Sequence, residues 1–371
     1  MEEATRRFVK ARAMREIMSL ALVSRMNVIM FGRGGHGKSE FTEAVLSAVD
    51  GLRIFVQFCG EGMDEARAYG GINLGALNDL NDPRIEYHPE DSFLASDVAV
   101  LEEGLDAPPS VLLSLKDTLT RRQMRNGRQK FDMQTMFLVC LTNHQPAEVA
   151  ELGDAVAAFI ERFPLQAQIE WDSYASGDYS EMFEAASNGN HKDFLVDVVE
   201  IVELQEAAGI VEIPTSVDKI LAELIASAVE GGAFISPRTA MYARKLVAAS
   251  AVINGRTVAT QQDIVAIKYL PGCEDLAAEI EQQIEAAAQR ADAQKQLEIV
   301  AGELANLKYE AEESERVIRL LQISQAADEV LDSLSQISVG NGQTEVRDSL
   351  RILAQELSNS AAKKAKDCTK K

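Results

Sequence analysis

Residues 27–40 read NVIMFGRGGHGKSE, an apolar run followed by a cluster of glycines that ends in Lys38-Ser39. The spacing from Gly32 to Gly37, Lys38 and Ser39 is the complete G-x-x-x-x-G-K-[ST] phosphate-loop pattern. In this pattern backbone N–H groups surround a triphosphate, and the helix that follows points its amino end at the anion. The lysine places a positive charge on the outer phosphates, and the hydroxyl ligates magnesium.

The residues on either side of the glycines have the structure that this motif requires. Asn27–Phe31 is a short apolar stretch bounded by glycine, which predicts a buried strand, and the residues after Ser39 have helical apolar spacing. GTP is not expected, because no Asn-Lys-x-Asp motif follows the last strand. The sequence therefore predicts an ATP site with Mg²⁺, whose nucleotide-binding residues are Gly32, Gly34, Gly35, His36, Gly37, Lys38, Ser39 and Glu40.

Composition narrows the class of protein. The chain has 371 residues, 46% of them hydrophobic, and a net charge of −21, which fits a globular protein of two or three domains. Its four cysteines form no CxxC pair and have no ligand spacing with the histidines, so neither a disulfide framework nor a zinc site is expected. The amino-terminal residues lack an apolar signal core, and charges interrupt every long apolar stretch. We therefore expect a cytoplasmic protein with no membrane segment.

Helices and strands alternate in the first 172 residues, which predicts a parallel α/β domain. The expected helices are 5–24 and 109–122, and the expected strands beyond the first are 52–59, 96–103 and 135–144.

The remainder of the chain reads as helical. Residues 173–190 are rich in small and turn-forming residues and predict a linker, and 191–272 predict an α-helical lid domain. In 275–338 apolar residues recur every three or four positions, which predicts a long helix or helical hairpin with coiled-coil character. After a Gly340-Asn341-Gly342 turn, 343–371 predicts a short helix and a disordered, lysine-rich tail.

Paired acids end the strand predicted at 96–103. An apolar strand followed by two acids, here Glu102-Glu103, is the Walker B arrangement. Phosphoryl transfer needs an acid that holds magnesium and a group that activates water. Glu102, where aspartate is usual, is therefore expected to hold the metal together with Ser39, and Glu103 is expected to activate water. The alternative is a strand end with two solvated acids.

The order of these motifs resembles that of AAA+ ATPases of the MoxR group. The resemblance is carried by RIEYHPEDSFLASDVAVLEEGLDAPPSVLLSLKDTLTRRQM, residues 84–124, and it extends over roughly residues 15–270. It implies a P-loop NTPase fold with an AAA+ parallel sheet core and an all-α lid, to which this chain adds its long C-terminal helical part.

The same resemblance implies roles for further polar residues. In CLTNHQP, Asn143 matches sensor 1, an amide that positions the attacking water. In AAFIERFPLQ, Arg162 matches the arginine finger, which acts on the nucleotide of a neighbouring subunit. In FISPRTAMYARKL, Arg238 matches sensor 2, and Arg122 matches an arginine common at the end of the helix after Walker B. An asparagine in a turn and arginines in solvated helices are the alternatives.

Two insertions interrupt the α/β pattern at 71–88 and 122–133, and both predict hairpins, the second from its Asn126-Gly127 pair. In relatives both project toward the central pore or face of a ring. The second is basic in an otherwise acidic chain, with Lys116, Arg121, Arg122, Arg125, Arg128 and Lys130 close together. A solvated hairpin paired to acids is the alternative.

These features favour a homo-oligomeric ring, expected to be a hexamer, that hydrolyses ATP to remodel or activate a protein partner. The resemblance implies that this partner carries a von Willebrand factor A (VWA) domain. A nucleic-acid-translocating motor of restriction or viral type is an alternative, which the basic hairpin favours and the net charge of −21 disfavours. An ATP-gated assembly or scaffold protein is another, and an intact Glu103 argues against it.

Overall fold

The chain divides into two units, Met1–Ile280 and Glu281–Lys371. The computed structural model describes residues 1–170, 174–187, 195–337 and 343–369, and the predicted turn at 340–342 lies outside them. None of the helices in the described ranges is long and apolar enough to cross a membrane.

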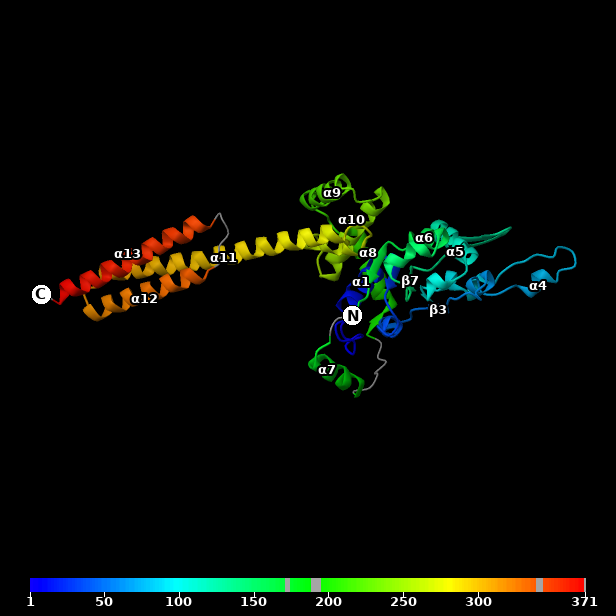
Figure 1. Cartoon of the computed structure of the whole chain (residues 1–371), viewed down its shortest axis with the longest axis horizontal. Coiled ribbons are helices and arrows are strands. Elements are labelled where there is room, and N and C mark those ends of the chain that lie inside the picture. Colours follow the sequence, from blue (N-terminus) through cyan, green and yellow to red (C-terminus); the bar gives the residue numbers. More distant parts are fainter. Residues whose placement is uncertain (171–173, 188–194, 338–342, 370–371) are drawn as a thin grey trace. The chain divides into compact units, whose positions relative to one another are not determined.

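A five-stranded parallel sheet forms the centre of the first unit (Figure 1). The strand order is β3 (Ile54–Phe58), β4 (Val98–Glu102), β7 (Phe137–Leu141), β1 (Val28–Phe31) and β8 (Leu165–Gln168). The three central strands β4, β7 and β1 are buried almost throughout, as expected for parallel strands that are covered on both faces. This sheet confirms the predicted parallel α/β core.

Helices cover both faces of the sheet. On one face α5 (Pro109–Arg121) and α6 (Asp154–Ile160) pack into a large core cluster with strand residues such as Ile29 and Leu138. On the other face α1 (Arg12–Ser24) contacts β1 and β8. The other elements of this region are α2 (Lys38–Ser47), β2 (Val49–Asp50), α3 (Glu65–Ala68), α4 (Leu74–Leu77), α7 (Ser176–Ser187) and β9 (Val196–Asp197), with short 3-10 turns at Pro89–Asp91, Phe93–Ala95, Gly104–Asp106 and Pro146–Glu151.

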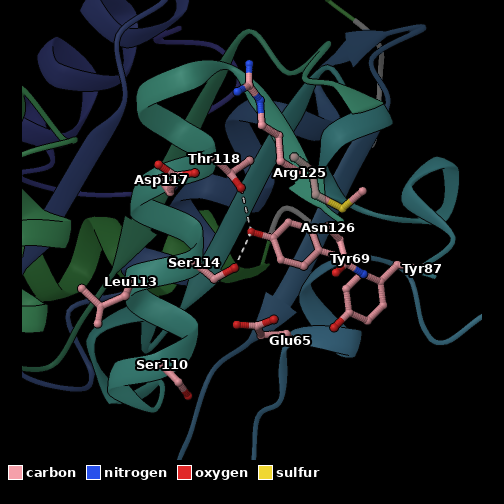
Figure 2. Close-up of a pocket in the computed structure, with 11 residues that line it drawn as sticks. Glu65, Tyr69, Tyr87, Ser110, Leu113, Ser114, Asp117, Thr118, Arg125 and Asn126 are labelled. Carbon is pink, nitrogen blue, oxygen red and sulfur yellow. Dashed lines mark hydrogen bonds between the residues drawn. The ribbon is translucent and has the colours of Figure 1, made fainter. Parts of the chain in front are cut away.

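The two insertions lie against each other. The predicted hairpin at 122–133 is present as β5 (Gln123–Asn126) and β6 (Gln129–Asp132). The segment 71–88 forms no paired strands; a single bridge between Ile72 and Tyr87 closes it around α4. Figure 2 shows the Tyr69 hydroxyl directed at Ser114 and Thr118 of α5, at 3.1 and 2.8 Å, with its ring stacked against Tyr87.

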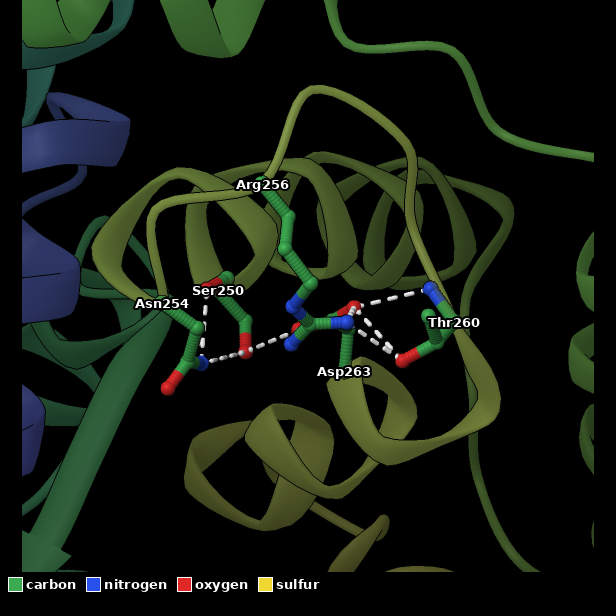
Figure 3. A network of polar contacts seen from close by, with 5 residues as sticks. All are labelled: Ser250, Asn254, Arg256, Thr260 and Asp263. Carbon is green, nitrogen blue, oxygen red and sulfur yellow. Dashed lines mark hydrogen bonds and ion pairs between the residues drawn. The ribbon is translucent and has the colours of Figure 1, made fainter.

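The lid consists of α8 (Val198–Ile210), α9 (Thr215–Glu230), α10 (Pro237–Ile253) and the 3-10 segment η5 (Gln261–Tyr269). Asp263 of η5 is completely buried and accepts hydrogen bonds from Ser250, Arg256 and Thr260 (Figure 3). Two of these come from the Arg256 guanidinium, at 2.7 and 2.8 Å. A buried carboxylate is tolerated only when charged or polar donors surround it, so this network ties η5 to α10.

The second unit contains the end of α11 (Glu274–Glu313), together with α12 (Val317–Gln336) and α13 (Thr344–Cys368). Leucines and alanines of all three helices form its core, among them Leu304, Leu334 and Leu357. The predicted long helix or hairpin is therefore part of a three-helix arrangement within this unit.

The hairpin predicted at 71–88 was wrong, because only one isolated bridge joins its ends, and three further local predictions were also wrong. The helix expected over 5–24 begins only at Arg12, because Lys10 has left-handed backbone angles that helical residues do not adopt. The predicted irregular linker 173–190 contains helix α7. The predicted disordered tail is the end of α13, because Ala361 and Ala365 are buried and the Lys364 ammonium donates to two carbonyls at the end of α11.

Asp263→Asn should destabilise the lid. The change removes the charge that faces Arg256, and we expect the free energy of unfolding to fall by about 3 kcal/mol, because breaking a buried pair leaves an uncompensated charge. Urea denaturation measures the loss. The matched control is Asp218→Asn, whose partner Arg244 is exposed, and which should cost less than about 1 kcal/mol. Equal losses from both changes would contradict a structural role for the Asp263 network.

Candidate nucleotide site

The phosphate loop connects β1 to α2 and depends on glycine backbone conformations. Gly32, Gly35 and Gly37 have φ values of +146°, +92° and +70°. At Gly32 a Cβ atom would also lie 2.4 Å from the carbonyl oxygen of Ile169, which follows β8. Glycine is therefore required there both for conformation and for close approach of the two chain segments.

Lys38 begins α2, and its side chain is only 6% exposed. The ammonium donates to the carbonyl oxygens of Gly32 and Arg33, at 2.5 and 3.2 Å, and to Oδ1 of Asn143 at 3.3 Å. Burial lowers the pKa of Lys38, and the nearby Glu103 carboxylate acts in the opposite direction. The charge thus lies inside the loop, where the outer phosphates of a nucleotide would replace the carbonyls as its partners.

Glu103 follows β4 and has left-handed backbone angles, φ 50° and ψ 42°. Its carboxylate accepts two hydrogen bonds from Asn143, one from the backbone N–H at 3.1 Å and one from the side-chain amide at 2.5 Å. The turn is packed tightly, since a Cβ atom at Gly104 would lie 2.5 Å from Sγ of Cys140. A non-glycine residue in this conformation costs about 1–3 kcal/mol and is typical of functional sites.

The predicted catalytic residues Glu103 and Asn143 therefore lie together, and Asn143 also contacts Lys38. The reason is the parallel sheet: β1, β4 and β7 are neighbours in register, so their carboxyl ends meet at one edge. A carboxylate and an amide held next to the phosphate-binding lysine can accept a proton from water and orient it.

The predicted metal residues are Ser39, in the first turn of α2, and Glu102, the last residue of β4. Neither the Ser39 hydroxyl nor the Glu102 carboxylate is engaged by another side chain within the described ranges. Hard oxygen donors suit Mg²⁺, which usually takes one or two protein ligands and completes its shell with phosphates and water. No group of three metal-ligating side chains occurs among the described residues, and the pair fits Mg²⁺ bound together with a nucleotide.

A pocket of about 490 Å³ adjoins the phosphate loop. Its walls come from Gly35 and Gly37 of the loop, from the amino-terminal residues 7–10, and from Tyr174 and Met182. Lys10 is ion-paired with Asp178 of α7 at 3.2 Å, which joins the amino-terminal segment to that helix. The size suits a nucleoside.

No pattern in the sequence predicted this pocket. Phe8 packs edge-on against Phe41 at 5.3 Å, and its ring lies next to Gly37. Phe8 therefore covers the phosphate loop, although it lies within the helix predicted at 5–24.

Two predicted arginines lie away from this group. The Arg162 carbonyl accepts from the Asn27 side chain at 2.8 Å, and its guanidinium bonds Thr120 and Glu161. Asn27 precedes β1, whereas the phosphate loop follows it. Arg162 therefore lies at the amino-terminal ends of the strands, about 16 Å along β1 from the phosphate loop. Arg238 lies in the first turn of α10 with an exposed side chain.

Comparisons with known proteins agree with this fold. Residues 1–206 match the family model described as the MoxR domain in the MoxR-vWA-beta-propeller ternary systems. The crystal structure of a candidate ATPase from Cytophaga hutchinsonii is similar with a TM-score of 0.59 and 17% sequence identity, over 76% of this chain and 92% of that one. At that identity the structural match supports the fold alone.

Lys38→Ala should weaken nucleotide binding by about a hundredfold, the loss expected when one charge-assisted contact is removed. Isothermal titration with ATP and Mg²⁺ measures the affinity. Lys130→Ala, which removes an exposed charge of the β5–β6 hairpin, is the control and should bind normally. If the Lys38→Ala protein bound ATP with unchanged affinity, the phosphate loop would not be the nucleotide-binding site.

Proposed function

The chain belongs to the MoxR family of AAA+ ATPases, and from that premise we propose that it hydrolyses ATP with Mg²⁺ to remodel or activate a protein partner. The observation that carries the proposal is the hydrogen-bonded group of Lys38, Asn143 and Glu103 at the carboxyl edge of the sheet. It combines a phosphate-binding charge, an amide and a carboxylate within contact distance of one another.

Each residue of the group has one task in this proposal. Lys38 leaves the loop carbonyls to bind the outer phosphates, and Asn143 orients the attacking water. Glu103 accepts the proton of that water. Ser39 and Glu102 would hold Mg²⁺, which neutralises charge on the phosphates when bound.

We further propose that the protein works as a ring, expected to be a hexamer. Arg162 lies at the amino edge of its own sheet, so it cannot reach the γ-phosphate bound at the carboxyl edge of the same chain. A guanidinium there is useful only to a nucleotide held by a neighbouring copy, as the arginine-finger assignment requires. Its present partner Glu161 is largely exposed, so the ion pair can be exchanged for phosphate at low cost. Arg238 is assigned to the γ-phosphate from the lid.

The partner is proposed to be a protein with a VWA domain, because the matching family model is named for MoxR–vWA–β-propeller systems. A cytoplasmic location fits such a system.

Several cationic side chains of the basic hairpin contact groups of their own chain, which argues against a nucleic-acid motor. Arg121 is paired with Asp117 at 2.8 Å and Arg128 with Asp82 at 3.7 Å, while Arg122 is directed at backbone carbonyls. Three of the six clustered cations thus have carboxylate or carbonyl partners within the described part of the chain, so a count of the cations overstates the charge that faces solvent.

Domain limits remain part of the proposal: 1–172 and 191–272 as the two ATPase subdomains around a 173–190 connection, and 275–338 and 343–371 as an added helical element. We assign this element to partner recruitment or ring stability by coiled-coil-like pairing. Exposed apolar residues on its surface, such as Ile318 and Ile352, support an associating role.

Glu103→Gln should bind ATP normally and hydrolyse it about 10²- to 10⁴-fold more slowly, because an amide cannot accept the proton of water. Steady-state phosphate release and equilibrium ATP binding separate the two properties. Glu102→Gln is the comparison, since it should respond chiefly in the Mg²⁺ dependence. A Glu103→Gln protein with the wild-type rate would take the general-base role away from this residue.

Arg162→Ala should bind ATP with nearly normal affinity and hydrolyse it about a thousandfold more slowly. Mixing it with Lys38→Ala protein tests the action between copies, because the Lys38 variant supplies an intact Arg162 to a neighbouring site. Partial recovery of the rate is expected as the mixing ratio is varied. No recovery in rings shown by native mass spectrometry to be mixed would rule out action in trans.

A further inference from the structure

Arg122 stands apart from the other arginines of the basic hairpin because its side chain is turned into its own chain. It ends α5 with left-handed angles, φ 54°. Its carbonyl accepts from the Met133 N–H at 2.9 Å, and its guanidinium donates to the carbonyls of Met133, at 3.4 Å, and of Thr135. Burial lowers the pKa of Arg122, and the neighbouring Arg25 acts in the same direction. Arg122 thus closes the base of the β5–β6 hairpin.

The segment that Arg122 holds, 133–136, is bonded on its other side to the residues that precede β4. The Gln134 N–H donates to the Leu94 carbonyl at 2.7 Å, and the Met136 N–H to the Asp97 carbonyl at 2.8 Å. The Thr135 hydroxyl, which is completely buried, donates to the Phe93 carbonyl. Arg122 therefore clamps the point where two strands of the sheet begin.

Those two strands, β4 and β7, carry the catalytic pair. They are paired in register from Val98 and Phe137 to Glu102 and Leu141. Each strand is five residues long, and the two are paired over their whole length; we therefore expect a displacement at the beginning of β7 to reach its end. Beyond the ends, the Glu103 carboxylate and Asn143 are joined by two hydrogen bonds.

We propose that Arg122 is a positioning residue that sets β7 against β4 and so holds Asn143 in contact with Glu103. The inference rests on the proposed ATP hydrolysis. It assigns Arg122 to its own subunit's site, unlike Arg162, whose task is on the neighbouring one.

The hairpin that Arg122 closes is itself bonded to the 71–88 insertion. Gln129 exchanges two hydrogen bonds with the Tyr87 backbone, at 3.0 and 2.8 Å, and Asn126 donates to the Ile85 carbonyl at 2.9 Å. The insertion exposes leucines, and Leu80 is 98% accessible. The two segments form one arm, and Arg122 lies at its base, between the arm and the beginning of β7.

The test begins with three substitutions at this one position, Arg122→Gly, Arg122→Ala and Arg122→Lys. Glycine is the cleanest, because it keeps the left-handed backbone at no cost and removes only the side chain. We expect kcat to fall at least tenfold while KM for ATP stays within about twofold, since the arm touches no part of the phosphate loop. Lysine should recover little, because an ammonium does not reproduce the planar fork that reaches two carbonyls.

Two further measurements distinguish a positioning role of Arg122 from a general loss of stability. Hydrogen exchange should become faster at the Asn143 N–H, which donates to Glu103, while the Lys38 helix keeps its protection. Arg121→Ala, which removes the adjacent charge from the same helix end, should change neither kcat nor exchange. Gln129→Ala, which loosens the arm beyond the clamp, should leave basal kcat unchanged.

Mixing separates this role from a finger. Lys38→Ala subunits should not rescue an Arg122 variant, although they rescue the Arg162 variant. Rescue, a rise in KM at constant kcat, or an equal loss in Arg121→Ala would each overturn the positioning role. If the Arg162 variant is not rescued either, the ring proposal fails. The separate effects on kcat and KM, and hydrogen exchange at the Asn143 N–H, would still test the positioning role of Arg122.

Discussion

The nucleotide site is organised around one buried positive charge, the ammonium of Lys38. A lone ammonium inside a protein is costly, so the structure must provide acceptors for it. Here they are two carbonyls of the phosphate loop and the side chain of Asn143. Because Asn143 also donates to Glu103, three strands of the sheet are linked at their carboxyl ends. A bound triphosphate would compete with Asn143 for Lys38 and so change the contacts of Asn143. Asn143 therefore connects phosphate binding to the Glu103 carboxylate, the proposed general base.

The sequence was most informative where function depends on short, contiguous patterns. Gly32 to Ser39, the paired acids 102–103 and Asn143 each follow an apolar strand, and the parallel order of strands brings them to one edge. What could not be predicted depends on contacts between distant segments. Phe8 over Gly37 requires the amino terminus to fold back, and the helical end of α13 requires packing of Ala361 into a core that propensity does not reveal. The inward direction of Arg122 likewise depends on Thr135, thirteen residues away.

The net charge of −21 and the basic hairpin pose a problem that the structure partly resolves. Three of the six clustered cations have carboxylate or carbonyl partners among the described residues: Arg121 and Arg128 are paired with carboxylates, and Arg122 is bonded to carbonyls. A count of charges along the sequence therefore overstated the positive surface. Arg128 joins the two insertions through Asp82, and Arg122 bonds the end of the hairpin to the segment that precedes β7.

The two ends of the parallel strands carry different groups of residues. The carboxyl edge of the sheet holds the phosphate loop, Glu103 and Asn143, and its amino edge holds Arg162 and the clamp formed by Arg122. In the proposals made above, Arg162 acts on the nucleotide of a neighbouring copy, whereas Arg122 acts on its own chain through the strands. Glu103 shows why the second route is effective: its left-handed conformation is unfavourable by about 1–3 kcal/mol and persists only while its surroundings hold it. Asn143 binds this carboxylate through two hydrogen bonds, so the proposed role of Arg122 predicts that a shift of β7 would disturb the conformation of Glu103.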